Sequence, residues 1–187
     1  AVSTTHGVYL YEAGSLQLLE TWITNDIQHS LVFSPDGSQL ASGSSRGEIS
    51  IWHIENGSLS VLPGSQPVLA LVYDSEGKRL ASSSWDHSIG LWSVPAFDRK
   101  ASLRAHEGPV NAARFANQGR TLYSAGGDGH VRQWDVEAAK YVRSPVENGW
   151  GINVLAIDET QDLLAYGTAN GRMCSTSLNG DRSTTDY

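Results

Sequence analysis

Cysteine, methionine and long apolar runs are scarce in this sequence. Its 187 residues include one cysteine, Cys174, and one methionine, so a disulfide framework cannot hold the chain together. No apolar stretch approaches the roughly 20 residues that a membrane-spanning helix needs. Basic residues are also few, because 13 lysines and arginines stand against 20 aspartates and glutamates. We therefore expect no disulfide scaffold and no membrane partner.

The charge and composition restrict the range of functions further. A net charge of −7 argues against a nucleic-acid partner, because phosphate binding needs a basic face. Charged residues at 18%, hydrophobic residues at 40% and 19 glycines are typical of a globular, turn-rich chain rather than a disordered one. A single cysteine and the lack of a visible secretory signal lead us to expect a cytoplasmic protein.

The chain repeats itself with a period of 40 to 42 residues. Four segments align without a gap, and they begin at residues 31, 71, 113 and 155. Their sequences are LVFSPDGSQLASGSSRGEISIWHI, LVYDSEGKRLASSSWDHSIGLWSV, ARFANQGRTLYSAGGDGHVRQWDV and LAIDETQDLLAYGTANGRMCSTSL. A partial copy precedes them, in which residues 7–11 match residues 48–52. Such a repeat indicates one structural unit that is copied in tandem.

Each unit has the pattern of short strands separated by turns. In the unit that begins at residue 31, an apolar run at 31–33 ends at the turn Ser34-Pro35-Asp36-Gly37. Strands are then expected at 40–44 and 48–54, and the hairpin turn Asn56-Gly57 leads to a fourth strand at 59–62. No segment has convincing helical periodicity. The sequence therefore predicts an all-β protein of four-stranded antiparallel sheets.

Units of this length and strand count resemble WD repeats, whose four-stranded sheets form the blades of a β-propeller. The unit that begins at residue 113 carries the resemblance most fully. It has Ala105-His106 where the family usually has Gly-His, followed by Gln118-Gly119, Asp128-Gly129 and Trp134-Asp135. The Trp-Asp dipeptide is replaced in the other units by Trp52-His53, Trp92-Ser93 and Thr176-Ser177.

The resemblance implies about four and a half blades within one propeller region, 1–187. The units are expected at 1–24 (partial), 25–64, 65–106, 107–149 and 150–187 (partial), the last ending after its third strand with a polar tail at 181–187. Rings of this family most often hold seven blades, so we expect a fragment of a seven-bladed ring. Remaining blades or a second chain must then cover the open ends, whose strand edges and apolar faces would otherwise be exposed.

The resemblance also implies a buried hydrogen-bond relay from a tryptophan through a serine and a histidine to an aspartate. Its members would be Trp134, Ser124, His106 and Asp128. The preceding unit keeps a partial set, Ser82, Asp86 and Trp92, but its loop 64–66 offers no histidine. Arg46 and Asn170 take the aspartate position in the other two units. We predict one fully connected blade with less connected neighbours.

Two patterns raise the possibility of a hydrolase. Ser124, His106 and Asp128 form a Ser-His-Asp set, yet the repeat predicts a buried serine instead of an exposed nucleophile beside an oxyanion hole. Residues 43–47 match G-x-S-x-G, which acts on a strand-to-helix turn, whereas a strand-to-strand corner is expected here. We expect no enzyme and no catalytic residue. The alternative is a catalytic propeller with an active site in its channel, although the inner strands are mainly apolar.

The other reactive residues have structural interpretations. Cys174 is expected to act as a small hydrophobic residue on a strand. The six histidines show no metal-ligand spacing, so we predict neither a metal site nor a cofactor. Asn56-Gly57-Ser58 matches a glycosylation triplet, but its place in the repeat indicates a hairpin turn.

Three tryptophans, Trp22, Trp85 and Trp150, do not recur with the repeat, and two of them mark a candidate partner site. Trp85 occupies a corner where the other units have small residues, and Trp150 precedes the last unit. Exposed tryptophan is enriched at binding hot spots, although isolated exposed apolar residues often carry no function, and both interpretations stay open. The resemblance implies docking near this corner and near the start of each first strand, at His29, Leu69, Asn111 and Asn153. We predict a non-catalytic interaction scaffold or sensor module that binds a protein or peptide, as part of a larger protein or complex.

Overall fold

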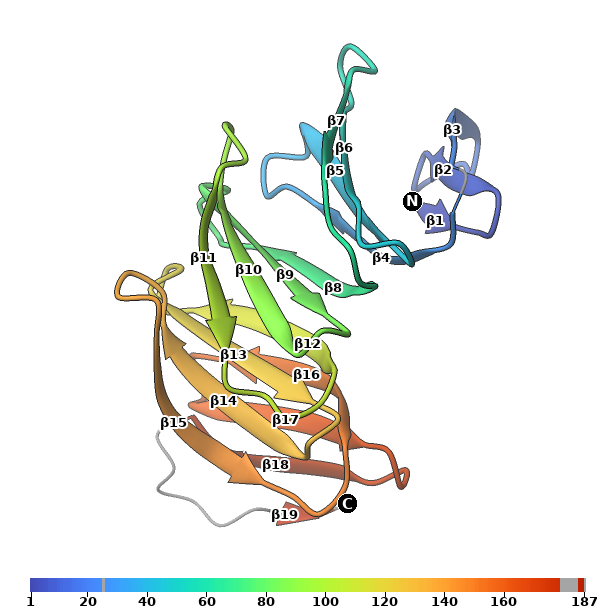
Figure 1. The fold of residues 1–187 in the computed structure, drawn as a ribbon. Coiled ribbons are helices and arrows are strands. Elements are labelled where there is room, and N and C mark those ends of the chain that lie inside the picture. Colours follow the sequence, from blue (N-terminus) through green and yellow to red (C-terminus); the bar gives the residue numbers. More distant parts are fainter. Residues whose placement is uncertain (25, 179–184, 187) are drawn as a thin grey trace.

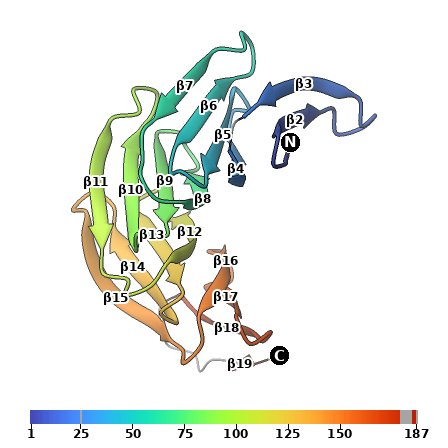
Figure 2. The same ribbon diagram turned by 45° about the vertical axis from the view of Figure 1, so that its right-hand side comes forward.

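Five antiparallel sheets, and no helix, make up the described part of the chain. The computed structural model describes residues 1–24, 26–178 and 185–186. Each sheet consists of strands that follow one another in the sequence. The sheets succeed one another along an open arc, from the N-terminal sheet in blue to the C-terminal sheet in red (Figure 1). The second view shows the same arc with the two termini on its end sheets (Figure 2). The predicted all-β partial propeller is therefore confirmed.

We name the sheets blades 1 to 5 in chain order. Blade 1 holds β1 (Val2–Ser3), β2 (Gly7–Tyr11) and β3 (Leu18–Ile23). Blade 2 holds β4 (Gln28–Phe33), β5 (Gln39–Ser44), β6 (Ile49–His53) and β7 (Leu59–Leu62). Blade 3 holds β8 (Val68–Tyr73), β9 (Arg79–Ser84), β10 (Ser88–Ser93) and β11 (Arg99–Arg104). Blade 4 holds β12 (Val110–Ala116), β13 (Thr121–Gly126), β14 (His130–Asp135) and β15 (Lys140–Glu147). Blade 5 holds β16 (Ile152–Asp158), β17 (Leu163–Thr168), β18 (Met173–Ser177) and β19 (Thr185–Asp186).

Blade 5 differs from the expectation that it would end after three strands. Residues 185–186, expected in a polar tail, pair with β18 in the register Cys174↔Asp186 and Ser175↔Thr185. An edge strand offers unpaired backbone groups, which a polar segment can satisfy as well as an apolar one. The other residues of the expected tail, 181–184 and 187, lie outside the described residues.

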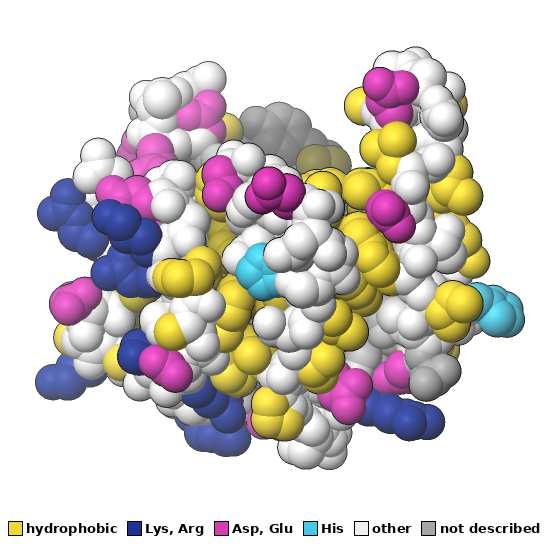
Figure 3. All heavy atoms as spheres, turned by 90° about the horizontal axis from the view of Figure 1, so that it is seen from above, with side chains coloured by type: hydrophobic (Ala, Val, Ile, Leu, Met, Phe, Trp, Pro, Cys, Tyr) yellow, Lys and Arg dark blue, Asp and Glu magenta, His cyan; other side chains and the backbone are white. Residues whose placement is uncertain are grey.

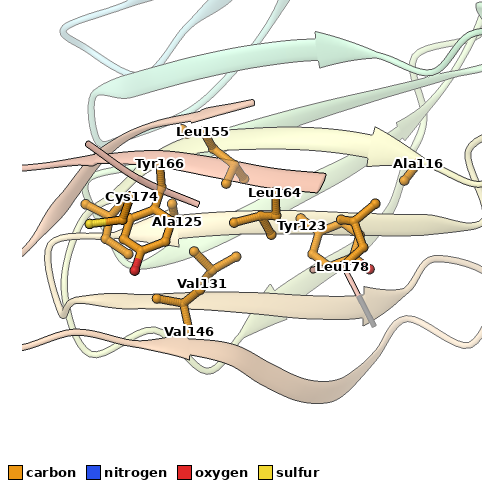
Figure 4. Close-up of a cluster of buried hydrophobic side chains, with 12 residues drawn as sticks. Ala116, Tyr123, Ala125, Val131, Val146, Leu155, Leu164, Tyr166, Cys174 and Leu178 are labelled. Atoms are coloured by element: carbon orange, nitrogen blue, oxygen red, sulfur yellow. The ribbon is translucent and has the colours of Figure 1, made fainter. Parts of the chain in front are cut away.

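The apolar core is divided into layers, each of which lies between two consecutive blades. Between blades 4 and 5, Tyr123 and Val131 face Leu164 of β17 and its neighbours (Figure 4). A second layer joins blades 2 and 3 and a third joins blades 3 and 4, while a small one around Val8 and Trp52 joins blades 1 and 2. Burial of apolar area is the main driving force for folding, so each blade depends on its neighbours for stability.

The end blades carry apolar side chains that no neighbour covers. On blade 1, Ile23 is 83% exposed, and on blade 5, Val154 and Met173 are 60% and 64% exposed. Residues in the layers between two blades differ, since Leu80, Ile89 and Leu122 are fully buried. Within the described residues, no helix is long and apolar enough to cross a bilayer.

Candidate partner-binding face

One corner geometry recurs at the same end of blades 2 to 5. Between the second and third strand of each blade, the corner residue donates its backbone N–H to the carbonyl that precedes the inner strand. The four pairs are Ser45 to Ile27 at 2.9 Å, Trp85 to Pro67 at 2.9 Å, Gly127 to Pro109 at 2.8 Å and Ala169 to Gly151 at 2.7 Å. Because the bond is the same with four different side chains, the corner backbone does not depend on what the corner residue carries. We call this end of the arc the corner face.

Trp85 is the large exception among these corner residues. Its side chain is 55% exposed, at a position where serine, glycine and alanine keep the same backbone bond. The indole is therefore not needed to build the corner. An exposed indole on a rigid frame is a typical anchor for a partner, since it offers apolar area at low cost in conformational entropy.

Trp150 lies on the same face, beside the corner of the next blade. It sits in the link between β15 and β16, is 59% exposed, and donates its backbone N–H to Asn148 Oδ1 at 3.0 Å. Asn148 in turn donates to the carbonyl of Gly129 at the corner of blade 4, at 2.8 Å. The structure thus brings both tryptophans to the corner face, and among the described residues no ring stacking joins them.

The four predicted first-strand positions share a structural feature that the sequence did not reveal. Each lies at a break in register between the inner strand and the second strand of its own blade. The breaks fall between Gln28 and Ser30, Val68 and Ala70, Val110 and Ala112, and Ile152 and Val154. A residue at such a bulge is left out of the ladder, and its side chain is redirected. His29, Leu69, Asn111 and Asn153 are these bulge residues.

The bulge side chains differ in what they contact. His29 is exposed, and its Nε2 lies 2.9 Å from Ser45 Oγ at the corner of blade 2. Asn111 reaches across to blade 5, where its Nδ2 donates to the carbonyl of Ile152 at 2.9 Å and lies 3.4 Å from Asn153 Oδ1. Leu69 is half-buried. Three of the four bulge residues are therefore polar, and Leu69 is the apolar one.

Blade 4 contains the relay of four side chains. The indole N–H of Trp134 donates to Ser124 Oγ at 2.8 Å, and Ser124 Oγ lies 2.7 Å from His106 Nε2. The other ring nitrogen, Nδ1, lies 3.0 and 3.1 Å from the two oxygens of Asp128. The relay ties β13 and β14 to the link before β12 and so fixes the corner of this blade.

Burial sets the protonation of the relay. Desolvation lowers the pKa of His106 to about 4, and the hydrogen bond and charge of Asp128 oppose this only in part. Burial alone would raise the pKa of Asp128, but hydrogen bonds from the Glu107 N–H and His106 hold it at about 2. At neutral pH, His106 is thus neutral and Asp128 is ionised. A carboxylate only accepts, so Nδ1 carries the ring proton and Nε2 accepts from the Ser124 hydroxyl.

Two members of this arrangement were missed by the sequence reasoning. Arg132 of β14 is almost fully buried, and its Nη1 donates to Asp128 Oδ2 at 2.6 Å. Nη1 also lies 2.7 Å from His106 Nδ1, but both atoms carry protons, so only the bond to the carboxylate is a hydrogen bond. Gly126 makes room for the imidazole, because a Cβ there would lie 2.6 Å from His106 Nδ1. The aligned sequences could have revealed Gly126, because the equivalent residues of the other blades all carry a hydroxyl. These residues are Ser44, Ser84 and Thr168.

Blades 3 and 2 hold only parts of this arrangement. In blade 3, the Trp92 indole donates to Ser82 Oγ at 2.9 Å, and Asp86 accepts instead from Ser88, with its Oδ2 3.4 Å from Arg104. In blade 2, Trp52 stacks on Trp22 of blade 1, with ring centroids 5.2 Å apart. Trp22 therefore belongs to the packing between blades.

The two hydrolase patterns occupy different environments. Ser124 is fully buried beneath Trp134, where no substrate can reach it. Ser45 of the G-x-S-x-G pattern is half-buried beside the exposed His29, but its corner leads into strand β6 and not into the helix that this motif requires. Among the residues that the structure describes, no carboxylate contacts His29 to orient it, and no group of three metal-ligating side chains occurs. Cys174 is buried in the layer between blades 4 and 5 (Figure 4).

The repeated sheets and the relay define the protein class as a WD-repeat β-propeller. The family model "WD domain, G-beta repeat" matches residues 17–53, 56–93 and 97–135, which together exceed half of the chain. The chain belongs to this family. Each match ends at the third strand of a blade, β6, β10 or β14, and blade 5 folds in the same way outside the matched ranges.

The relatives are WD-repeat proteins of diverse names. The chain is 36% identical over 116 residues to "Telomerase protein component 1" of Rattus norvegicus, covering 55% of this chain and 4% of that protein. It is 26% identical to "COMPASS component SWD3" of Saccharomyces cerevisiae, covering 77% and 47%. It is 39% identical to "Nuclear distribution protein nudF 1" of Talaromyces marneffei, covering 64% and 28%. The chain thus spans less than half the length of these curated relatives.

Solved structures share the fold. The "Structure of U3-55K" superposes with a TM-score of 0.80 at 22% identity, covering 88% of this chain and 52% of that chain. The "Crystal structure of RRP9 WD40 repeats" gives a TM-score of 0.79 with the same identity and coverage. At this identity the likeness establishes the propeller fold alone.

Proposed function

We propose that this chain belongs to a non-catalytic interaction scaffold or sensor, and that its corner face binds a protein or peptide partner. Trp85 carries the proposal, because the fold holds an exposed indole at a corner that a serine, a glycine or an alanine builds equally well. Trp150 and the four bulge residues extend the same face. Loops on a rigid frame lose little entropy on binding, which favours this role.

The expected partner is a protein rather than a nucleic acid. The net charge is −7, and on the face shown in Figure 3 basic side chains lie along the left and lower margins, while hydrophobic side chains lie exposed between polar ones. A relative that is named as a component of COMPASS supports a protein partner by analogy. We propose further blades or a second chain as the cover of the apolar end blades, on which Ile23 and Met173 are exposed.

Affinity purification with paired variants tests the corner face. Trp85→Ser installs the residue that blade 2 has at this corner, so the corner backbone should persist. Val142→Ser is the matched control, because Val142 is 52% exposed on the outer strand β15. Proteins retained by the wild type and by Val142→Ser but lost with Trp85→Ser support the proposal. Equal retention by all three proteins contradicts it.

A catalytic propeller is the second candidate, and Ser45 beside His29 is the observation that favours it. His29 is exposed and Ser45 is half-buried, and Ser45 Oγ lies 2.9 Å from His29 Nε2. A serine-reactive fluorophosphonate probe decides between the two candidates. The scaffold proposal expects no labelling of Ser45, whereas labelling that Ser45→Ala and His29→Ala both abolish would support catalysis.

A further inference from the structure

Blade 3 lacks both side chains that fill the relay of blade 4. The link 63–67 before β8 and the link 105–109 before β12 have the same length, and Gly64 takes the position of His106. Arg132 of β14 corresponds to Gly90 of β10 in the repeat. Two glycines thus replace an imidazole and a guanidinium, while Ser82, Asp86 and Trp92 remain.

A polar cavity of about 80 Å³ lies at this position. Its walls include all three remaining relay residues of blade 3, Ser82, Asp86 and Trp92, and also Ser84 and Ser88. One water needs about 10–15 Å³ of such space, so the cavity has room for several waters or one small ring. A ligand there would meet hydrogen-bonding groups on most sides.

Ser82 and its counterpart in blade 4, Ser124, differ in what their hydroxyl protons contact. Its Oγ is buried and accepts the Trp92 indole N–H at 2.9 Å, as Ser124 accepts from Trp134. Ser124 also donates to His106, whereas among the described residues none accepts the proton of Ser82. A buried hydroxyl favours having a partner for its proton.

Asp86 also lines the cavity and provides an ionised acceptor. Burial alone would raise its pKa, but hydrogen bonds from Ser88 and Ser84 and the charge of Arg104 hold that pKa below its usual range. Arg104 lies 3.4 Å from Oδ2, and the Arg99 guanidinium lies 5.5 Å from the centre of the Trp92 ring. Two cations against one carboxylate disfavour a positively charged ligand.

We propose that this cavity binds a neutral imidazole ring, which accepts the Ser82 hydroxyl with one nitrogen and donates the other N–H to Asp86. Imidazole combines an acceptor and a donor on opposite edges, which matches Ser82 and Asp86. Ser84 takes part of the space that Gly126 leaves to His106, so the ring lies nearer to Gly90, in the space that Arg132 fills in blade 4. The ring belongs to a free small molecule or to a histidine of a partner.

Titration of the wild-type chain with imidazole tests the proposal directly. The readout is the ¹⁵N–¹H signal of the Trp92 indole, assigned through Trp92→Phe. We expect a saturable shift of this signal, and binding about tenfold weaker in Ser82→Ala because one buried hydrogen bond is lost. Affinity for total imidazole should fall as the pH drops below about 6.5, where an imidazole becomes charged. No partner protein takes part, so the result is independent of the proposed function.

His106→Gly provides the positive control, since it vacates the imidazole's own place between Ser124 and Asp128 in blade 4. Imidazole should then shift the Trp134 indole signal, which it leaves unchanged in the wild type. A shift of Trp134 in His106→Gly without any shift of Trp92 in the wild type would overturn the proposal. Ser82→Ala binding as tightly as the wild type would also overturn it.

A second ligand distinguishes the two sources of the ring. Nα-acetylhistidine amide carries the imidazole on a peptide unit, as a partner's side chain would. Binding of both compounds supports a partner's histidine as the occupant. Binding of imidazole alone supports the site and indicates a free small molecule as its ligand. Binding of neither compound contradicts the proposal.

Discussion

The backbone of Gly126 lies so close to His106 that a Cβ at residue 126 would come within 2.6 Å of the imidazole Nδ1. This contact explains why glycine occurs in the one blade that has the histidine. In the other blades the equivalent hydroxyls serve their own corners: Ser44 accepts from the N–H groups of Arg46 and Glu48, and Ser84 accepts from Asp86. A histidine at the link and a hydroxyl at this corner residue therefore do not occur in the same blade.

Gly126→Ser should destabilise the chain by about 1–3 kcal/mol, because the new side chain overlaps the buried imidazole and separates it from Asp128. Gly127→Ser is the matched control, since a Cβ there would come no closer than 3.3 Å to Pro109 and blade 2 has serine at this corner. Urea unfolding measures both. In a His106→Ala background the cost of Gly126→Ser should shrink, and strictly additive effects would contradict the contact.

The sequence predicted the parts of this site that recur with the repeat. The turn residues and the 40- to 42-residue period predicted the strand order, and the resemblance to WD repeats implied the relay of Trp134, Ser124, His106 and Asp128. Arg132 could not be predicted, because a strand position reveals its burial only once the neighbouring blade and link are in place. Strand β19 could not be predicted either, since the edge of β18 and not an apolar pattern determines its pairing.

His106→Ala should lower stability by about 1–3 kcal/mol, because the buried Ser124 hydroxyl loses the acceptor of its proton and Asp128 loses the imidazole N–H. His87→Ala should change stability by less than about 0.5 kcal/mol, since His87 is exposed at a turn. Thermal unfolding of the two variants beside the wild type is the measurement. Equal melting temperatures for the two variants would refute the structural role of the relay.

His87 is also expected to be a strained residue. Its φ is 68°, and the equivalent residues of blades 2, 4 and 5 are Gly47, Gly129 and Gly171, with φ of 94°, 79° and 85°. The left-handed conformation costs a residue with a Cβ about 1 kcal/mol. His87→Gly should therefore raise the free energy of unfolding by about 0.5–1 kcal/mol, as urea unfolding would show. Ser45→Gly, at a corner position without positive φ, should give no gain, and a gain there would point to a general effect of glycine.

As the pH falls, protonation of His106 on unfolding should destabilise the chain before most carboxylates are protonated. The pKa of His106 is about 4 in the folded chain and about 6.5 when unfolded, so the unfolded chain binds more protons between these values. The free energy of unfolding is then fully retained above about pH 6.5 and declines by roughly 2–3 kcal/mol as the pH falls to 4. Asp128, with a pKa of about 2, adds a further loss only below its ordinary value. Urea unfolding at pH 7, 5.5 and 4.5 measures the decline, which should be shallower in His106→Gln because that variant has no ring to protonate. Parallel pH curves for the two proteins would show that His106 gains no proton on unfolding. That result would contradict the interpretation that its imidazole is buried in the neutral form.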